Sequence, residues 1–295
     1  MKILFISSGL FPDYQNDMVF HGLKSKFGSE VSESKDIWFM YNDITTDQKK
    51  GLYGKGFTLY GNLDPRLRNV ENEQSLPDKI KSKYYDLIIY GSIHRDGSYL
   101  KNVLKVYPKD RIIFIDGEDG DKIMKKLTKV GLYFKRELID KYNGYKVFHL
   151  NFAIPKDKIV NKIPDKTKEW ATIVPGDMKT YIFDSQTDYY LDYQRARYGV
   201  TTKKSGWDCL RHYEILANGC IPFFPDLEVC PPKTLTLLPK QIIIESNRLI
   251  KEKMFTDERY NLYLSFLLDW TRHKLTTEAL VDYIFEIFIK SVNYA

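Results

Sequence analysis

The sequence contains few cysteines and no long apolar segment. Its three cysteines, Cys209, Cys220 and Cys230, lack CxxC spacing, which favours reduced, buried thiols over a disulfide framework or a zinc site. No apolar stretch approaches the roughly 20 residues that cross a bilayer, and the stretch that follows Met1 is too short for a signal peptide. We therefore expect a cytoplasmic protein without a transmembrane segment.

The chain also lacks a strong overall charge. Its formal net charge is +6, but residues 122–168 contain 13 Lys or Arg against 4 Asp or Glu, whereas the remainder contains 32 against 35. The positive excess therefore lies in one segment, which indicates an anionic partner. Charge that only keeps helix faces soluble is the alternative.

Short apolar runs alternate with helical patterns along the chain, which is typical of βαβ units around parallel sheets. Lys2–Ser7, Asp86–Tyr90 and Arg111–Ile115 predict strands, and Asn16–Phe27 predicts a helix. A length of 295 residues is comfortable for two domains. The expected fold class is α/β, with a parallel sheet in each domain.

A segment rich in Lys and Pro, with little apolar content, divides the two expected domains. This linker covers residues 156–168, so the first domain is expected to span 1–155 and the second 169–295. Trp170–Val174 then predicts the first strand of the second domain.

Two helices are predicted at the end of the chain. One begins at Thr256 and continues through Trp270, and the other runs from Thr276 to about Val292. Each starts with a capping threonine followed by acidic residues. In the second helix apolar residues recur at helical spacing. We expect this stripe to pack on a core, with attachment to a membrane surface as the alternative.

The most informative stretch runs from Gly206 to Phe224 and predicts a short capped helix followed by a buried strand. Asp208 is a suitable N-cap for a helix over 209–217, Asn218-Gly219 offers a left-handed C-cap, and an apolar run over 220–224 follows. A glycine before a helix start lets an anion approach the unpaired first-turn amides. Arg211 and Glu214 lie three residues apart, so they share a face.

This stretch resembles the donor-binding helix of GT-B glycosyltransferases, in which a glutamate, an Ala-x-Gly motif and a proline precede or enter a strand of the second domain. The matching residues here are Glu214, Ala217, Gly219 and Pro222. The resemblance implies two Rossmann-like domains that face a central cleft, with terminal helices packing back on the first domain. It assigns Glu214 to the donor ribose. A plain helix-to-strand corner with a solvated glutamate is the alternative.

The resemblance also implies how the donor diphosphate is held. Gly206 and Arg211 would face the phosphates, and Lys204 and Arg197 add positive charge shortly before the helix. GT-B enzymes commonly use such side chains in place of a metal, so no cofactor and no metal ligand are expected. Many retaining members carry a further glutamate where this chain has Gly206, so the stereochemical outcome stays open.

Two loops of the first half offer candidates for the acceptor side. Asp13 and Asp17 follow the first strand, and His21 lies one helical turn after Asp17, so these two could pair. Because histidine titrates near neutrality, His21 could act as a general base, although a structural histidine is the commoner case. His94 follows the predicted strand that ends at Tyr90 and is expected near the cleft.

Carboxylates cluster directly after another predicted strand, in Asp116-Gly-Glu118-Asp119-Gly-Asp121. Such clustering raises at least one pKa by mutual repulsion or binds a cation. Glu118 and Asp119 are the preferred candidates for the base that deprotonates an acceptor hydroxyl. Asp119-Gly-Asp121 also resembles the DxD motif of GT-A glycosyltransferases, which would require a divalent ion such as Mg²⁺. A solvated acidic turn is the third possibility.

A glycine-rich, aromatic segment from Gly51 to Gly61 lacks the GxxxxGK[ST] spacing of a phosphate loop. Its glycines permit close backbone approach, and its aromatic rings offer stacking faces. The segment is equally compatible with a loop that contacts a sugar or a base and with an irregular surface loop.

Together these features predict a glycosyltransferase that uses a nucleotide sugar such as a UDP-sugar. The basic segment indicates an anionic acceptor: a hydroxymethylated base in phage-type duplex DNA, a surface glycan, or a lipid-linked phosphate. A non-catalytic nucleotide-binding protein and a glycoside hydrolase are the competing classes. The identities of the sugar, nucleotide and acceptor, and the oligomeric state, stay open.

Overall fold

The first sheet is built from short apolar strands that are buried on both faces. The computed structural model describes residues 1–293 and contains a six-stranded sheet in the order β2-β1-β3-β4-β5-β6, in which every neighbouring pair is parallel. Because the order reverses between β1 and β3, the sheet is doubly wound. Its strands are β1 (Ile3–Ile6), β2 (Val31–Glu33), β3 (Leu87–Tyr90), β4 (Ile112–Asp116), β5 (Leu132–Lys135) and β6 (Val147–His149).

Helices cover both faces of this sheet. Alternate strand residues point to opposite faces, so Ile3 and Phe5 join the core under α1 and α9, whereas Leu4 and Ile6 join the core under α3 and α4. The helices of the chain are α1 (Tyr14–Phe27), α2 (Thr46–Lys50), α3 (Leu76–Lys81), α4 (Leu100–Val106), α5 (Gln186–Arg195), α6 (Leu210–Ala217), α7 (Lys240–Lys251), α8 (Asp257–Lys274) and α9 (Thr277–Asn293).

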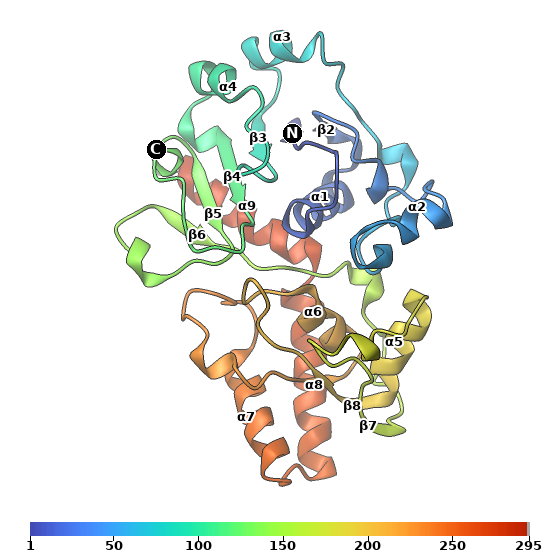
Figure 1. The fold of residues 1–295 in the computed structure, drawn as a ribbon. Coiled ribbons are helices and arrows are strands. Elements are labelled where there is room, and N and C mark those ends of the chain that lie inside the picture. The colour runs from blue at the N-terminus through green and yellow to red at the C-terminus, as the bar shows by residue number, and fades with distance from the viewer. Residues whose placement is uncertain (294–295) are drawn as a thin grey trace.

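A second, smaller parallel sheet forms the centre of the other lobe (Figure 1). Its order is β7-β8-β9, with β7 (Lys168–Trp170), β8 (Ala196–Val200) and β9 (Ile221–Phe223). The predicted strand over 170–174 is therefore wrong in position, because the chain leaves the sheet after Trp170. The α/β class with two parallel sheets is confirmed.

The last helix returns to the first lobe and packs on α1 (Figure 1). The predicted start of α8 is confirmed, since the Thr256 side chain accepts a hydrogen bond from a backbone amide of its first turn. The apolar stripe of α9 is buried through Leu280, Ile284 and Phe288. This packing, and not a membrane surface, accounts for the stripe. None of the helices in residues 1–293 combines the length and apolar character that a membrane crossing needs.

Candidate functional site

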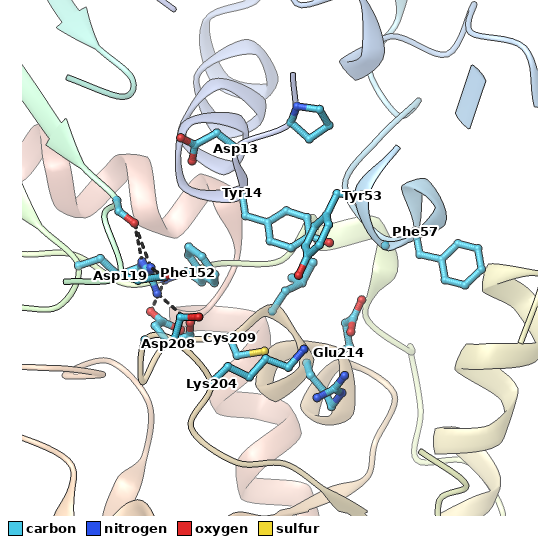
Figure 2. Close-up of a pocket in the computed structure, with 18 of the residues that line it drawn as sticks. Asp13, Tyr14, Tyr53, Phe57, Asp119, Phe152, Lys204, Asp208, Cys209 and Glu214 are labelled. Carbon is cyan, nitrogen blue, oxygen red and sulfur yellow. Dashed lines mark hydrogen bonds and ion pairs between the residues drawn. The ribbon is translucent and has the colours of Figure 1, made fainter. Parts of the chain in front are cut away.

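A cavity of about 750 Å³ lies between the two lobes. The loops that follow β1, β3, β4 and β5 form one wall, and the loop after β8 together with the start of α6 forms the other (Figure 2). This is the carboxyl edge of the parallel strands, where ligands bind in open α/β sheets. Eight of the predicted site residues line the cavity: Asp13, His94, Glu118, Asp119, Lys204, Gly206, Arg211 and Glu214.

Asp17 and His21 lie outside the cavity, which corrects their predicted roles. Asp17 is fully buried and accepts hydrogen bonds from the Asp13 amide (2.8 Å) and the Tyr60 hydroxyl (3.0 Å). His21 Nδ1 lies 2.9 Å from Thr277 Oγ1, at the contact between α1 and α9. His21 therefore joins two helices and has no access to an acceptor hydroxyl. The expected pairing of Asp17 with His21 does not occur.

Arg197 also lies away from the cavity. It is on β8, where its Nη1 lies 2.7 Å from the Asp257 carboxylate and its guanidinium packs 4.0 Å from the centre of the Tyr260 ring. The prediction that Arg197 binds the donor is therefore not supported by its position. Its contacts tie β8 to the start of α8.

The carboxylates that follow β4 are engaged separately by different cations. Asp119 pairs with Arg136, and Asp121 pairs with Lys141. That second contact lowers the pKa of Asp121 below its ordinary value, so the mutual repulsion expected from the sequence does not dominate there. Glu118 is the most open of the group, with a side chain that is 56% exposed. Within residues 1–293, no group of three or more His, Cys, Asp or Glu has the arrangement of a metal site.

Arg136 is a central residue of the site that the sequence did not single out. Its side chain is 2% exposed and donates to the backbone oxygens of Gly117 (2.9 Å) and Asp208 (2.8 Å). It also pairs with the carboxylates of Asp119 and Glu137. Arg136 thus connects the wall made by the first lobe to the start of α6. It directly follows β5, so recognising that strand would have placed Arg136 at the same edge as the other candidates.

A second polar group of the first lobe surrounds Asp13. The Asp13 carboxylate accepts a hydrogen bond from Ser92 Oγ (2.7 Å) and pairs with Arg95 Nε (3.1 Å). His94 is next to Arg95, and its Nε2 lies 3.5 Å from the Glu118 carboxylate. The loops after β1, β3 and β4 are therefore linked by side chains, and they form one polar wall.

The start of α6 differs from the prediction by one residue. Cys209, not Asp208, is the N-cap, and its side chain makes no capping hydrogen bond. The Asp208 carboxylate instead accepts from the Phe152 amide (2.7 Å) in the first lobe. Burial raises the pKa of Asp208 to about 7, which makes it a further titratable group on the cavity wall.

Gly206 is needed for a contact between the lobes. A Cβ at this position would lie 2.6 Å from the Glu137 carboxylate and 3.0 Å from Arg136 Nη1. Close approach of a ligand was the reason expected from the sequence, but close approach of the first lobe already requires a glycine here. Gly206 nevertheless lines the cavity beside Asp119.

Glu214 faces the cavity from α6 and is 7% exposed. Its carboxylate accepts hydrogen bonds from the hydroxyl groups of Thr58 and Tyr189. Burial raises the pKa of Glu214 above its ordinary value, whereas these two hydrogen bonds act in the opposite direction. The alternative of a solvated Glu214 is therefore wrong.

Two cations of the second lobe line the cavity near Glu214. Arg211 Nη2 donates to the Tyr181 hydroxyl (2.9 Å), and its Nε and Nη1 are buried without a hydrogen-bond partner among residues 1–293. Lys204 is exposed and lies before the helix. Unpaired buried donors are costly, so the Arg211 guanidinium is suited to an anionic ligand.

Aromatic side chains form much of the remaining surface of the cavity. Figure 2 shows Tyr14, Tyr53 and Phe152 between Asp119 on one side and Glu214 on the other. The sequence indicated aromatic contacts only for the segment from Gly51 to Gly61, whose residues Tyr53, Gly54, Lys55, Phe57 and Tyr60 do line the cavity. The other rings come from α1, α5 and irregular segments of the chain. The aromatic residues that line the cavity are Tyr14, Tyr53, Phe57, Tyr60, Phe152, Tyr181, Phe183 and Tyr189.

Comparison with solved structures identifies the fold. An alpha-glucosyltransferase in complex with UDP and a 13-mer DNA containing an HMU base is similar over 97% of this chain and 98% of that chain, with 9% sequence identity and a TM-score of 0.51. HepE of Anabaena, in complex with UDP-glucose, covers 100% of both chains with 9% identity and a TM-score of 0.48. The likeness to the first of these structures shows the predicted GT-B-type fold. No protein-family model and no curated protein sequence matches it.

Proposed function

We propose, starting from this fold, that the chain is a glycosyltransferase that moves a sugar from a nucleoside diphosphate sugar to an acceptor hydroxyl. The observation that carries the proposal is the composition of the two walls of one cavity. The second lobe contributes cations and a buried glutamate, and the first lobe contributes carboxylates. Transfer from such a donor separates a sugar cation from a diphosphate, so both kinds of charge are needed at the reacting atoms.

The donor is proposed to lie along the start of α6. Arg211 and Lys204 would neutralise the departing diphosphate, and Glu214 would hold the ribose. The unpaired Nε and Nη1 of Arg211 support this role, because each is a charged donor that a phosphate oxygen can satisfy. With these cations in place we propose transfer without a bound metal ion. The DxD alternative is disfavoured, since Asp119 and Asp121 pair with two different cations.

The acceptor is proposed to enter from the side of the first lobe. Glu118 and Asp119 are the candidates for taking the proton of its hydroxyl. Asp119 is held in place by the buried Arg136 guanidinium, and Glu118 is open to the cavity. Asp119→Asn should therefore reduce turnover while leaving donor affinity nearly unchanged. An equal loss of both would assign Asp119 to donor binding.

A hydroxymethylated base in duplex DNA is our preferred acceptor. The structurally similar alpha-glucosyltransferase was solved with UDP and DNA, and the rings of Tyr14, Tyr53 and Phe152 offer stacking surfaces for a base turned out of the helix. Not all of the basic excess in residues 122–168 is available to DNA, because Arg136, Lys141 and several other residues pair within the protein.

Calorimetric titration with UDP, GDP and their sugar conjugates tests the donor site. We expect one nucleotide to bind, with affinity that persists in EDTA and falls at least about tenfold in Glu214→Ala, which removes a hydrogen bond to a charged group. Glu228→Ala, at an exposed position outside the cavity, is the matched control. Undiminished affinity of Glu214→Ala would overturn the site assignment.

Turnover then separates the competing classes of function. Release of the nucleoside diphosphate should accelerate when duplex oligonucleotides with a 5-hydroxymethyl pyrimidine are added, and unmodified duplexes should have no effect. Acceleration by an acidic oligosaccharide alone would assign a glycan acceptor. Nucleotide binding without turnover would indicate a binding protein, and cleavage of glycosides without a nucleotide would indicate a hydrolase.

A further inference from the structure

The segment Tyr53–Thr58 belongs to the first lobe but makes contacts across the cavity with the second. Lys55 Nζ lies 2.6 Å from the Asp184 carboxylate. The ring of Phe57 stacks on Tyr189, with 5.8 Å between ring centres and 28° between planes. In Figure 2, Phe57 lies beside the helix α5 of the second lobe. The segment therefore holds the two lobes together next to Glu214.

Thr58 is the point at which this segment reaches Glu214. It is fully buried, and its hydroxyl donates to one oxygen of the Glu214 carboxylate. The same hydroxyl accepts from Tyr190 (2.7 Å), and the Thr58 amide donates to Gln186 Oε1 (2.6 Å). The other Glu214 oxygen accepts from Tyr189 (2.6 Å). Both oxygens of the proposed ribose-binding carboxylate are thus already occupied by protein hydroxyls.

The backbone that delivers Thr58 is strained. Thr58 has a φ of 70°, in the left-handed region that a β-branched residue rarely adopts. Lys55 also has a positive φ, of 56°. Such conformations persist only where surrounding contacts hold them, and they concentrate at functional sites. The bonds of Thr58 to Glu214, Tyr190 and Gln186 are the contacts that hold it.

We infer that the Thr58 hydroxyl occupies the place on Glu214 that a ribose hydroxyl of the donor takes, so that Thr58 competes with the donor and must be displaced when the donor binds. This inference rests on the proposed function. A ribose hydroxyl exchanges one donated hydrogen bond for another and leaves the carboxylate satisfied. A nucleotide without that hydroxyl leaves the bond between Thr58 and Glu214 in place, because breaking it would leave a buried carboxylate oxygen unpaired. Its affinity should therefore not depend on the Thr58 hydroxyl.

The test compares two nucleotides on two variants. Calorimetry would measure the dissociation constants of UDP and 2′,3′-dideoxy-UDP for the wild type, for Thr58→Val and for Thr58→Ser, with the guanosine pair used if GDP is the nucleotide that binds. Valine keeps the shape of threonine and removes the competing hydroxyl, whereas serine keeps the hydroxyl. We expect Thr58→Val to bind UDP about tenfold more tightly, because the free carboxylate has lost a partner.

Selectivity is the decisive readout. Thr58→Val should leave the affinity for dideoxy-UDP within about twofold of the wild type, since that ligand offers Glu214 no hydroxyl to replace the lost bond. Thr58→Ser should restore the wild-type ratio between the two nucleotides. Weaker or unchanged UDP binding by Thr58→Val, or an equal gain for both nucleotides, would overturn the inference. Failure of UDP and GDP to bind any variant would instead overturn the proposed function itself.

A second variant covers the case in which Thr58→Val does not fold. Lys55→Met removes the ion pair with Asp184 from an exposed part of the same segment. It should tighten UDP binding in the same direction and leave dideoxy-UDP unaffected. If Lys55→Met binds UDP no better than the wild type does, the contact of the segment with the second lobe does not compete with the donor.

Discussion

Arg136 contacts both walls of the cavity, so removing its guanidinium should affect the whole site. Breaking a buried ion pair by removing one partner costs about 3–5 kcal/mol, and the Glu137 carboxylate, whose side chain is 5% exposed, would stay buried without its partner. We expect Arg136→Met to reduce the free energy of unfolding by that amount in a urea titration. It should also reduce turnover, because Asp119 is no longer held in place.

Lys141→Met is the matched control for Arg136. Lys141 pairs with Asp121 in the same loop, but its side chain is 51% exposed. Exposed ion pairs contribute at most about 1 kcal/mol, so the free energy of unfolding of this variant should lie within that margin of the wild-type value. Similar losses of unfolding free energy in the two variants would show that the buried contacts of Arg136 stabilise the protein no more than an exposed ion pair does.

Glu214 should make donor binding dependent on pH. Burial raises its pKa above the ordinary value of 4.5, and only the ionised carboxylate can accept hydrogen bonds through both oxygens, one from Tyr189 and one from a ribose hydroxyl. Affinity should therefore be full at high pH and decline as the pH falls through the raised pKa, at a higher pH than an ordinary glutamate would give. Titrations of UDP at a series of decreasing pH values would measure this. An equal pH dependence in Glu214→Gln would assign the titration to another group.

At the level of elements, α6 shows what local sequence could and could not predict. Its extent was correct to within one residue, and Gly219 takes the left-handed conformation that its place after the helix indicated, with a φ of 61°. The N-cap was wrong because Asp208 bonds to Phe152, which lies 56 positions earlier in the chain. Local signals cannot reveal a partner that only the packing of two lobes brings close.

Gly206→Ala tests whether the start of α6 is fixed by this packing. A Cβ would lie 2.6 Å from the Glu137 carboxylate, and relieving such crowding costs about 1–3 kcal/mol. We expect lower turnover and a thermal midpoint several degrees below the wild type, as that cost implies for a protein of this size, about 2–4 °C for each kcal/mol. Gly144→Ala is the control, because a Cβ at Gly144 meets no atom of residues 1–293 within 4 Å. Unchanged turnover in Gly206→Ala would show that the two walls tolerate separation.

For the whole molecule, the order of apolar runs sufficed to predict two parallel sheets, and the resemblance to GT-B glycosyltransferases implied the return of the C-terminal helix to the first domain. The residues of the site were harder to predict, because those of the two lobes are far apart in the sequence and come together only in the folded structure. His21 illustrates the difficulty: its position after the first strand indicated the cavity, but its side chain lies between α1 and α9. Which side of α1 is covered by protein depends on the helix that packs against it. Here that helix is α9, which begins at Thr277, near the end of the chain.

Because α9 packs on α1, we expect the substitution Gly22→Ala to destabilise the protein, whereas the same change in a solvated helix would stabilise it. Alanine is favoured over glycine within a helix by about 1 kcal/mol, so Gly22→Ala would stabilise α1 if its surface were free. A Cβ at Gly22 would, however, lie 2.1 Å from the backbone oxygen of Thr277. We expect Gly22→Ala to lower the free energy of unfolding by about 1–3 kcal/mol, measured in urea.

Ser25→Ala, at an exposed position of the same helix, is the control and should be neutral or slightly stabilising, because alanine is the better helix former. Since α9 carries the end of the chain from the second lobe back to the first, the loss in Gly22→Ala should lower the transition of both lobes together. A stabilised Gly22→Ala would mean that α9 does not pack on α1, and the apolar stripe of α9 would then need another surface to cover it.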